Sequence, residues 1–223
     1  APKTGRVEIL NDVVFNNSAQ NKAIHFTDNF DTKKLDLNWN FRRYPIEDIY
    51  KINKEENRLN LFCHPNQIKE RGRAALLGFK QTESDFEYLT QMYFQPKSTD
   101  SEAGISLFQK DDNYINFTII KKGDKHQLQV YAVKNGKILE LIKDELRQYR
   151  GNIKFKVIAD KDVYKLYYSL KGIDFKLFAS LEGSYLKSNG YTGAHLGLYA
   201  TGNGKNNQDF ASFDYVNYLI KKK

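Results

Sequence analysis

The sequence predicts an all-β protein made of two antiparallel sheets. Several segments alternate apolar and polar residues, as in 152–159, where Ile153, Phe155 and Val157 share one face and lysines the other. Short turn sequences such as Asn135-Gly136, the strongest hairpin signal, recur between these segments. The chain holds 15 Tyr and 15 Phe, which favour pleated, half-buried surfaces. Because alternating strands follow one another through short turns, without βαβ spacing, a sandwich or barrel is favoured.

The expected strands follow directly from this alternation. They are 58–63, 73–80, 85–95, 103–109, 112–122, 126–134, 152–159, 163–170, 173–181 and 193–200. In 163–170 the residues Tyr164, Leu166 and Tyr168 share one side. The one segment that could form a helical turn is 143–149, and the glycine-rich stretch 202–204 is expected to be a hairpin loop.

The predicted domain organisation is one sandwich over residues 24–223, preceded by an N-terminal extension or linker over residues 1–23. The extension is polar and rich in Asn, with one plausible strand at Arg6–Leu10. A chain of 223 residues fits one large domain, and no Pro/Gly/Ser linker divides the remainder. The Ala-Pro-Lys start fits either a terminus left by signal cleavage or a cut within a longer polypeptide.

Composition excludes several classes of protein. The net charge is +8, but the lysines are scattered, which indicates a solvated surface and not a nucleic-acid-binding face. The apolar runs are far shorter than the roughly 20 residues of a membrane helix. One cysteine excludes an internal disulfide and thiolate zinc sites, and the four histidines, at 25, 64, 126 and 195, share no zinc-motif spacing.

A catalytic interpretation depends on three carboxylates at every second position, Glu83, Asp85 and Glu87. A pair of neighbouring carboxylic acids is what a glycosidase requires. Ser84, however, stands where a strand with a buried reverse face needs an apolar residue, and the alternation begins only at Phe86. A charged strand entrance is therefore favoured, and a stand-alone polysaccharide hydrolase or lyase is the alternative.

Aromatic and planar polar side chains near strand ends suggest sugar binding. Sugars stack on aromatic faces and bond to Arg, Gln, Asn and Asp side chains. The candidate sugar-binding residues are Trp39, Arg73, Gln81, Gln109, Asn113, Tyr114, Tyr199 and Asn203. Trp39 can equally belong to the core, and the amides can cap turns. Most of six residues are expected to rim one concave groove, namely Arg73, Gln81, Gln109, Asn113, Tyr114 and Tyr199.

A series of short motifs in a fixed order carries a family resemblance over about residues 24–220. The motifs are Phe26-Thr-Asp-Asn-Phe30, Leu35-Asp-Leu-Asn-Trp39, Arg58-Leu-Asn-Leu61, Ala74-Ala-Leu-Leu-Gly-Phe-Lys-Gln-Thr82, Glu102-Ala-Gly-Ile-Ser-Leu-Phe-Gln109, Asp111-Asp-Asn-Tyr114, Tyr167-Tyr-Ser-Leu-Lys-Gly172, Thr192-Gly193, Gly197-Leu-Tyr-Ala-Thr-Gly-Asn-Gly204 and Phe213-Asp-Tyr-Val-Asn-Tyr218. Together they resemble the concanavalin A-like β-sandwich that follows the catalytic propeller in family 43 β-xylosidases and arabinofuranosidases.

The resemblance implies a two-sheet jelly roll and a non-catalytic, ancillary role beside a glycoside hydrolase domain. Such modules are also classed as carbohydrate-binding modules for xylan, so the implied partners are xylan or arabinoxylan, their oligosaccharides and a family 43 catalytic propeller. Polysaccharide partners imply a secreted, periplasmic or cell-surface location. Phe79-Lys80-Gln81 departs from the Arg-Arg-Gln of many members, so a ligand role at position 79 does not carry over. An interaction module for protein partners is a further possibility.

A wider resemblance concerns metal. Concanavalin-like glucanases often hold one structural Ca²⁺ through two backbone carbonyls and an Asp. The matching positions are Asn29, Asn57 and Asp214. Oxygen ligands suit calcium. The alternative is that Asp214 only bonds to backbone near the chain ends.

Overall fold

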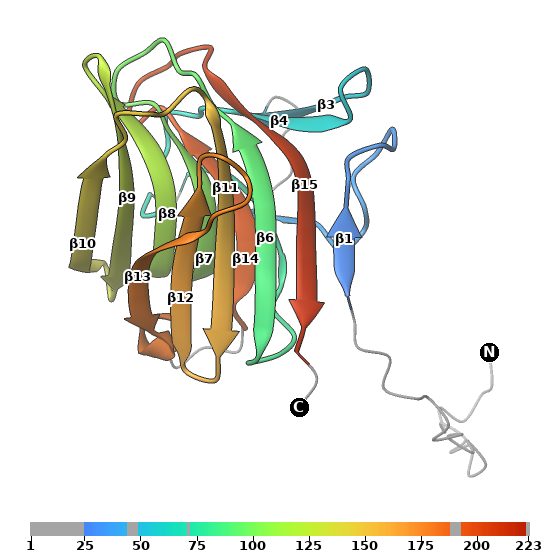
Figure 1. Cartoon of the computed structure of the whole chain (residues 1–223), viewed down its shortest axis with the longest axis vertical. Helices are drawn as coiled ribbons and strands as arrows, with labels where there is room; N and C mark the ends of the chain where they lie inside the picture. Colours follow the sequence, from blue (N-terminus) through green and yellow to red (C-terminus); the bar gives the residue numbers. More distant parts are fainter. Residues whose placement is uncertain (1–24, 44–48, 71, 188–192, 222–223) are drawn as a thin grey trace, which may run out of the picture.

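The chain folds as two antiparallel sheets packed face to face (Figure 1), in a computed structural model that describes residues 25–43, 49–70, 72–187 and 193–221. The first sheet, sheet A, has the order β13-β12-β11-β6-β15-β4-β3, with β1 paired to β15. The second, sheet B, has the order β10-β9-β8-β7-β14-β5-β2. The predicted all-β sandwich is therefore confirmed. The expected strand Arg6–Leu10 lies outside the described residues.

The bounds of the strands are as follows. Sheet A contains β1 (Phe26–Asp28), β3 (Tyr50–Asn53), β4 (Arg58–Phe62), β6 (Phe86–Tyr93), β11 (Asn152–Asp160), β12 (Val163–Ser169), β13 (Lys176–Glu182) and β15 (Phe210–Ile220). Sheet B contains β2 (Asn40–Phe41), β5 (Ala75–Lys80), β7 (Glu102–Lys110), β8 (Asn113–Lys122), β9 (Lys125–Lys134), β10 (Lys137–Glu145) and β14 (His195–Thr201). The short 3-10 helix η2 (Gly183–Leu186) follows β13.

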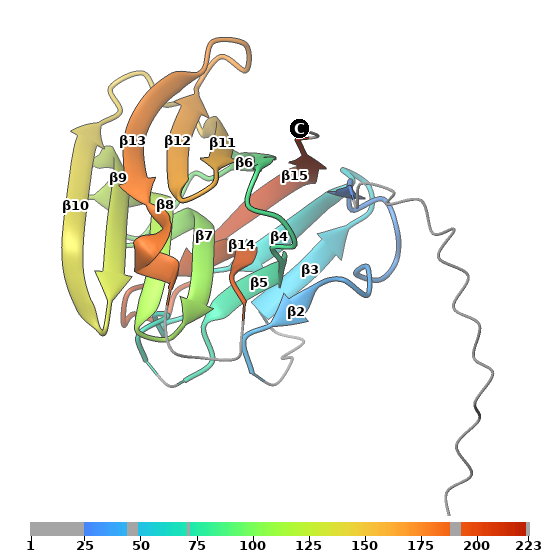
Figure 2. The same ribbon diagram turned by 90° about the horizontal axis from the view of Figure 1, so that it is seen from below.

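The hydrophobic core lies between the sheets and is built from the alternation that the sequence shows. Ile153, Phe155 and Val157 of β11 are buried, and Tyr164 and Leu166 of β12 face the same core. Burying one such side chain contributes about 1.5–3 kcal/mol relative to leaving it in water. The edge strands β10 and β13 lie at one side of the sandwich, and β2 and β3 lie at the other (Figure 2).

The expected helical turn at 143–149 is wrong in its first part, because strand β10 continues to Glu145. This strand pairs with β9 almost throughout, with a bulge between Ile138 and Glu140. The bulge shifts the apolar–polar alternation, and the edge position leaves nearly the whole strand exposed. This strand therefore lacks the alternation of buried and exposed positions that reveals a strand in a sequence. The glycine-rich stretch 202–204 does form the predicted loop, between β14 and β15.

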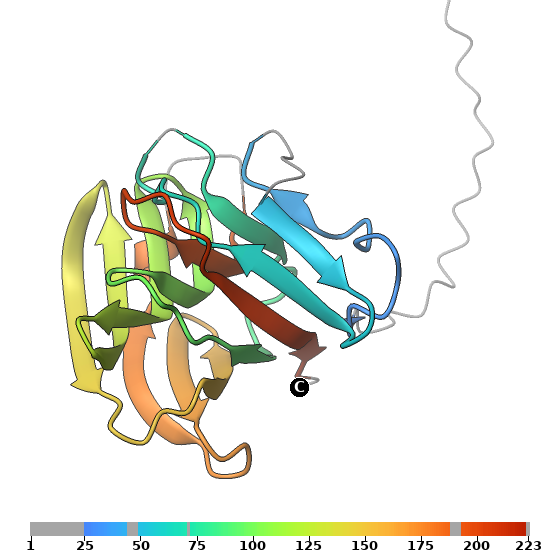
Figure 3. The same cartoon turned by 90° about the horizontal axis from the view of Figure 1, so that it is seen from above.

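The hairpin of β3 and β4 runs beside β15 when the sandwich is seen from above (Figure 3).

In the described part of the chain, no helix is long and apolar enough to cross a membrane.

Candidate functional site

The outer face of sheet B, turned away from the core, carries a second cluster of buried side chains. Strand alternation sends Leu196 and Leu198 of β14 into the core and Tyr199 to the outer face. The outer cluster contains Ile68, Ala74, Leu76, Tyr114, Val133 and Tyr199, with Phe108 and Tyr131 packed against it. An outer sheet face is normally wet in an antiparallel sandwich. Here it is covered, and residues 64–70, termed the strap, supply the cover through Ile68.

The strap is fixed to the loop after β14 by several hydrogen bonds. The Thr201 hydroxyl donates to the carbonyl of His64 at 3.0 Å and also reaches that of Asn66 at 3.3 Å. The amides of Gly202 and Gly204 donate to the carbonyls of His64 and Pro65, both at 2.8 Å. These bonds satisfy backbone groups that would otherwise be unpaired in a covered loop.

Arg42 fixes the other end of the strap. Its Nη2 donates to the Glu70 carbonyl at 2.8 Å, and its Nη1 donates to the Gly72 carbonyl at 3.3 Å. The same guanidinium donates from Nε to Asp111 Oδ1 at 2.7 Å. Its side chain is only 4% exposed, so this ion pair is screened less than a surface pair.

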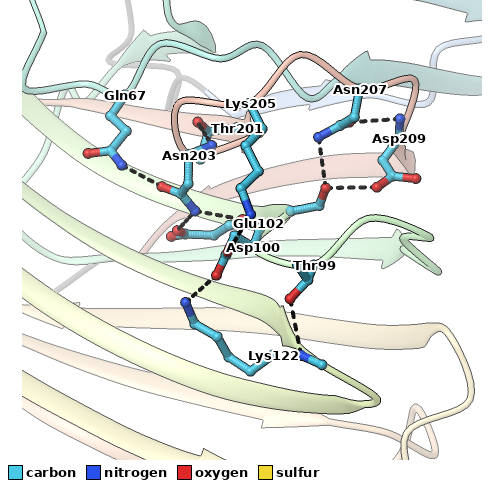
Figure 4. A network of polar contacts seen from close by, with 12 residues as sticks. Gln67, Thr99, Asp100, Glu102, Lys122, Thr201, Asn203, Lys205, Asn207 and Asp209 are labelled. Atoms are coloured by element: carbon cyan, nitrogen blue, oxygen red, sulfur yellow. Dashed lines mark hydrogen bonds and ion pairs between the residues drawn. The ribbon is translucent and has the colours of Figure 1, made fainter.

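Glu102 is the buried carboxylate of this face, and three donors hold it, of which Figure 4 shows Asn203. Its Oε1 accepts from the Thr118 hydroxyl at 2.8 Å and from the Tyr131 hydroxyl at 2.9 Å. Its Oε2 accepts from Asn203 Nδ2 at 2.9 Å. Asn203 in turn accepts from Gln67 of the strap at 2.6 Å. A buried charge requires such partners, so the network ties the strap to the sheet.

A second set of contacts fastens the loops beside this network (Figure 4). Asp100 pairs with Lys122 at 2.5 Å and with Lys205 at 2.8 Å. Hydrogen bonds from Lys122 and then Lys205 lower the pKa of Asp100. Asp209 accepts from the Lys97 and Ser98 amides and from the Ser101 hydroxyl. All these contacts are accounted for by holding loops together.

The tyrosines of the outer face lie close enough to Glu102 to sense its charge. Burial, together with the Glu102 carboxylate, raises the pKa of Tyr114, Tyr131 and Tyr199. Tyr114 and Tyr131 also meet edge to face, with ring centroids 6.2 Å apart. These hydroxyls are therefore neutral donors and acceptors at any physiological pH.

Three of the predicted sugar-binding residues come together at this face. Tyr114 and Tyr199 belong to the same buried cluster, and Asn203 contacts Glu102 at its border. Glu102, Asn116 and Tyr131 were not among the residues predicted from the sequence. The pattern that could have revealed them is the alternation along β7 and its neighbours. Polar side chains recur there at every second position, opposite the apolar side chains of the core, and so mark a second face of the sheet.

The other predicted sugar-binding residues lie elsewhere. Trp39 is in the core, where its Nε1 donates to Asp28 at 2.7 Å, as the competing interpretation had it. Gln81 accepts from the Tyr164 hydroxyl at 3.1 Å, so it faces sheet A. Gln109 is buried beside the bulge in β7, whereas Arg73 is exposed. Asn113 accepts from the amide of Asn135, the turn-capping role that was the alternative.

The predicted open groove differs from the structure in one respect. Four of its six residues, Gln109, Asn113, Tyr114 and Tyr199, are buried. For Tyr114 and Tyr199 the reason is tertiary, because Ile68 of the strap packs in their cluster, and alternation along a strand cannot report a loop that comes from elsewhere in the chain. Sugar binding by these residues remains a prediction.

The proposed calcium positions lie around the middle of β15, between the residues that pair with β4 and those that pair with β1. Asn29 and Asn57 are exposed. The Asp214 carboxylate accepts from Arg58 Nε at 2.5 Å, so a guanidinium already compensates its charge. A divalent cation on that carboxylate would lie beside a fixed positive charge, and like charges at such a distance repel. The donor set in this arrangement does not fit Ca²⁺.

The carboxylates of the catalytic alternative lie at a strand entrance. Strand β6 begins at Phe86, so Glu83 and Asp85 precede it, as the alternation predicted. The Asp85 carboxylate accepts from the Lys161 amide at 3.0 Å, which is a turn contact. Glu87 pairs across to Ile158 and Leu219 within sheet A. These contacts hold a turn and a strand in place, and they do not favour the hydrolase alternative.

The chain matches a known family of protein domains. The family model described as the β-xylosidase C-terminal concanavalin A-like domain matches residues 27–219. The chain belongs to this family. The resemblance seen in the sequence motifs is therefore confirmed, including the concanavalin A-like form of the sandwich.

Curated relatives are much longer than this chain. A xylosidase/arabinosidase of Butyrivibrio fibrisolvens is 26% identical over 177 residues, which cover 76% of this chain and 33% of the relative. A non-reducing end α-L-arabinofuranosidase, BoGH43B of Bacteroides ovatus, is 23% identical over 195 residues, covering 86% and 36%. The chain thus spans about a third of the length of the curated relatives it matches.

Solved structures show the same fold. The Bacteroides ovatus protein described as xyloglucan PUL GH43B superposes with a TM-score of 0.81 at 21% identity, covering 87% of this chain and 39% of that one. The GH43 protein BlXynB of Bacillus licheniformis gives 0.80 at 20% identity, with the same coverage. A functionally unknown protein of Saccharomyces cerevisiae gives 0.59 at 12% identity, and the match covers 83% of this chain and 96% of that one.

Proposed function

We propose that this chain is the ancillary β-sandwich of a family 43 glycoside hydrolase and works beside a catalytic domain of the same enzyme. The observation that carries the proposal is the match of the family model to nearly all of the sandwich, residues 27–219. The curated relatives that it matches are a xylosidase/arabinosidase and an α-L-arabinofuranosidase, and the match covers 33% and 36% of their lengths. The sandwich makes up about a third of such an enzyme, so the catalytic residues belong to the rest of the polypeptide.

The finer part of the proposal is that the sandwich binds or helps to position xylan-type polysaccharide, such as arabinoxylan or its oligosaccharides. The relatives support this ligand class, because one is a xylosidase/arabinosidase and the other an α-L-arabinofuranosidase. The aromatic and polar outer face of sheet B, with Tyr114, Tyr199 and Asn203, supplies suitable chemistry. Because such polymers lie outside the cytoplasm, the proposal extends to a secreted, periplasmic or cell-surface protein.

The ancillary role is tested by the natural coding sequence around this segment. A family 43 catalytic domain in the same polypeptide is expected. The enzyme with and without residues 25–221 is then compared for thermal stability and for kcat/KM on xylo-oligosaccharides and arabinoxylan. Removal is expected to lower at least one of these quantities. A natural polypeptide without a glycosidase domain, or an enzyme indifferent to the deletion, would contradict the proposal.

The sugar-binding part needs its own experiment. Affinity electrophoresis of the 223-residue chain in gels containing xylan, arabinoxylan or no polysaccharide measures binding directly. Retardation by the xylans is expected. Equal migration in all gels would leave the chain a purely structural brace for the catalytic domain.

A further inference from the structure

A row of small side chains crosses the outer face of sheet B beneath the aromatic cluster. Gly78 of β5 pairs with Gly197 of β14, which pairs with Ser106 of β7, which pairs with Asn116 of β8. We call these four positions the furrow. A Cβ added to Gly197 would meet the Leu77 carbonyl oxygen at 2.9 Å, so a larger residue is not accommodated there. These four positions carry short side chains or none, and they lie between rows of larger side chains.

The taller rows are aromatic or aliphatic. On one side lie Leu76 and Tyr199, which pair with each other, and on the other side lies Tyr114, paired with Phe108. Tyr131, paired with Asn116, closes the end of the furrow towards β9. A furrow with polar groups at its floor and aromatic rings at its walls has the composition of a sugar site.

Unpaired polar atoms lie in the furrow. Ser106 and Asn116 are 0% exposed, yet Ser106 Oγ and Asn116 Oδ1 make no hydrogen bond to any residue that the structure describes. Buried polar groups are nearly always paired, because an unpaired one loses its bonds to water. Two such atoms at paired positions indicate that their hydrogen-bond partners are groups other than the residues that the structure describes.

The electrostatics of the face select the chemistry of that partner. Glu102 brings a buried negative charge to this face, and its three donors already satisfy it. An anionic ligand would be repelled. Hydroxyl groups both donate and accept, so they can bond to Asn116 Oδ1 and to the Ser106 hydroxyl at once.

We propose that the furrow is a binding site for a neutral polyhydroxyl chain, closed in this structure by the strap with Ile68 as its plug. The identification of that chain as a xylan-type sugar rests on the proposed function. Ile68 is 0% exposed and packs in the cluster with Tyr114 and Tyr199. Ligand entry requires the strap to leave the sheet, which breaks the hydrogen bonds from Thr201, Gly202 and Gly204.

Calorimetry of the 223-residue chain with xylohexaose tests the furrow, with oligogalacturonate as the anionic comparison. Ser106→Ala removes an unpaired oxygen, so it is expected to leave the melting temperature unchanged or raised while weakening xylohexaose binding about fivefold, the effect of one lost hydrogen bond. A Cβ at Gly78 would come no nearer than 3.4 Å to any atom, so Gly78→Ala adds a methyl group to the furrow without strain. It is also expected to weaken binding. Gly193→Ala, with only Lys80 Cε within reach at 3.7 Å, is the matched control.

A second pair of variants tests the strap. Ile68→Ala shortens the plug and is expected to tighten xylohexaose binding by lowering the cost of opening. Ile173→Ala, at a side chain that is 84% exposed, is the matched control and should bind as the parent does.

The outcomes separate the furrow from the wider function. Xylohexaose binding that Ser106→Ala and Gly78→Ala leave unchanged would overturn the furrow while sugar binding elsewhere on the sandwich stands. Absence of binding in both the parent and Ile68→Ala would overturn the furrow together with sugar binding, whereas the ancillary role would still be judged by the deletion experiment. Tighter binding of oligogalacturonate than of xylohexaose would overturn the neutral-ligand assignment.

Discussion

Glu102 shows at the scale of one residue how this sandwich departs from a simple two-layer pattern. Its side chain points to the outer face of an antiparallel sheet, where a charged residue is normally solvated, yet it is 2% exposed. Thr118, Tyr131 and Asn203 donate hydrogen bonds to it, and these three donors allow the carboxylate to be buried. A single carboxylate thus connects β7, β8, β9 and the loop after β14.

Glu102→Gln is predicted to destabilise the fold. A carboxylate accepts at both oxygens, but the amide NH₂ of Gln would face either the Asn203 amide donor or the Thr118 and Tyr131 hydroxyls. Loss of one hydrogen bond to a charged group and a mismatched donor together cost about 2–4 kcal/mol. Urea denaturation measures it, with Glu140→Gln at an exposed position as the control. A variant as stable as the parent would show that Glu102 is not held as described.

Asp100 is predicted to make stability depend on pH in the acid range. Lys122 and Lys205 hold the pKa of Asp100 below its usual value of 3.8 in the folded state. A depressed folded pKa contributes stability above the unfolded pKa, and this contribution is lost as the pH falls through the folded pKa. Melting temperatures between pH 2 and 6 are therefore expected to fall less steeply in Asp100→Asn than in the parent below about pH 4. The exposed Asp160→Asn should behave as the parent.

At the scale of elements, β10 stands out because it is an edge strand with aliphatic side chains in solvent. Ile138, Leu139 and Leu141 are 60%, 53% and 50% exposed. Exposed edges invite pairing with other chains, and the bulge and lysines of this strand are the usual means of opposing it. The strap differs from β10 in both respects. It is a loop without a strand or helix, and tertiary contacts hold it in place.

The isolated chain is predicted to self-associate weakly through β10. Leu141 lies at the middle of the exposed part of the strand, so Leu141→Lys adds an edge charge without touching the core. Light scattering across a concentration series is expected to show less association for this variant than for the parent. Val163→Lys, on β12 of the other sheet, which is not an edge strand, is the comparison. Equal association of all three proteins would exclude β10 as the contact.

At the scale of the whole molecule, the first and the last described strands, β1 and β15, pair with each other, and an ion pair lies beside that junction. Arg58 joins β4 to Asp214 of β15 and also pairs with Glu56 at 3.2 Å. The junction holds because β15 bonds to β6, β4 and β1 along its length. Charge compensation by an arginine is the alternative to charge compensation by a metal ion.

Chelation is predicted to leave the fold unaffected. Because Arg58 already neutralises Asp214, EDTA should not lower the melting temperature, and added Ca²⁺ should not raise it. Arg58→Met, which retains much of the packing and removes the charge, should lower the melting temperature and lose the Asp214 bond. A clear fall with EDTA, reversed by Ca²⁺, would restore the calcium site.

The sequence alone determined the fold class, most strands and which of their side chains enter the core. Alternation in β6, β11 and β12 was sufficient because one side of each strand faces a dry core and the other faces water. It also determined the family, since the motifs lie in strands and turns that the fold requires. It failed at β10, where the edge position leaves no burial contrast to read.

Only the tertiary structure decided the nature of the outer face of sheet B. The strap comes from residues 64–70 and covers strands that start after residue 100, so no local pattern connects the two. The same holds for Arg58, whose partner Asp214 lies 156 positions away in the chain. Long-range contacts of this kind arise from how the sheets stack and where loops fold back. Because of these contacts, Tyr114 and Tyr199 are buried beneath the strap and do not rim an open groove.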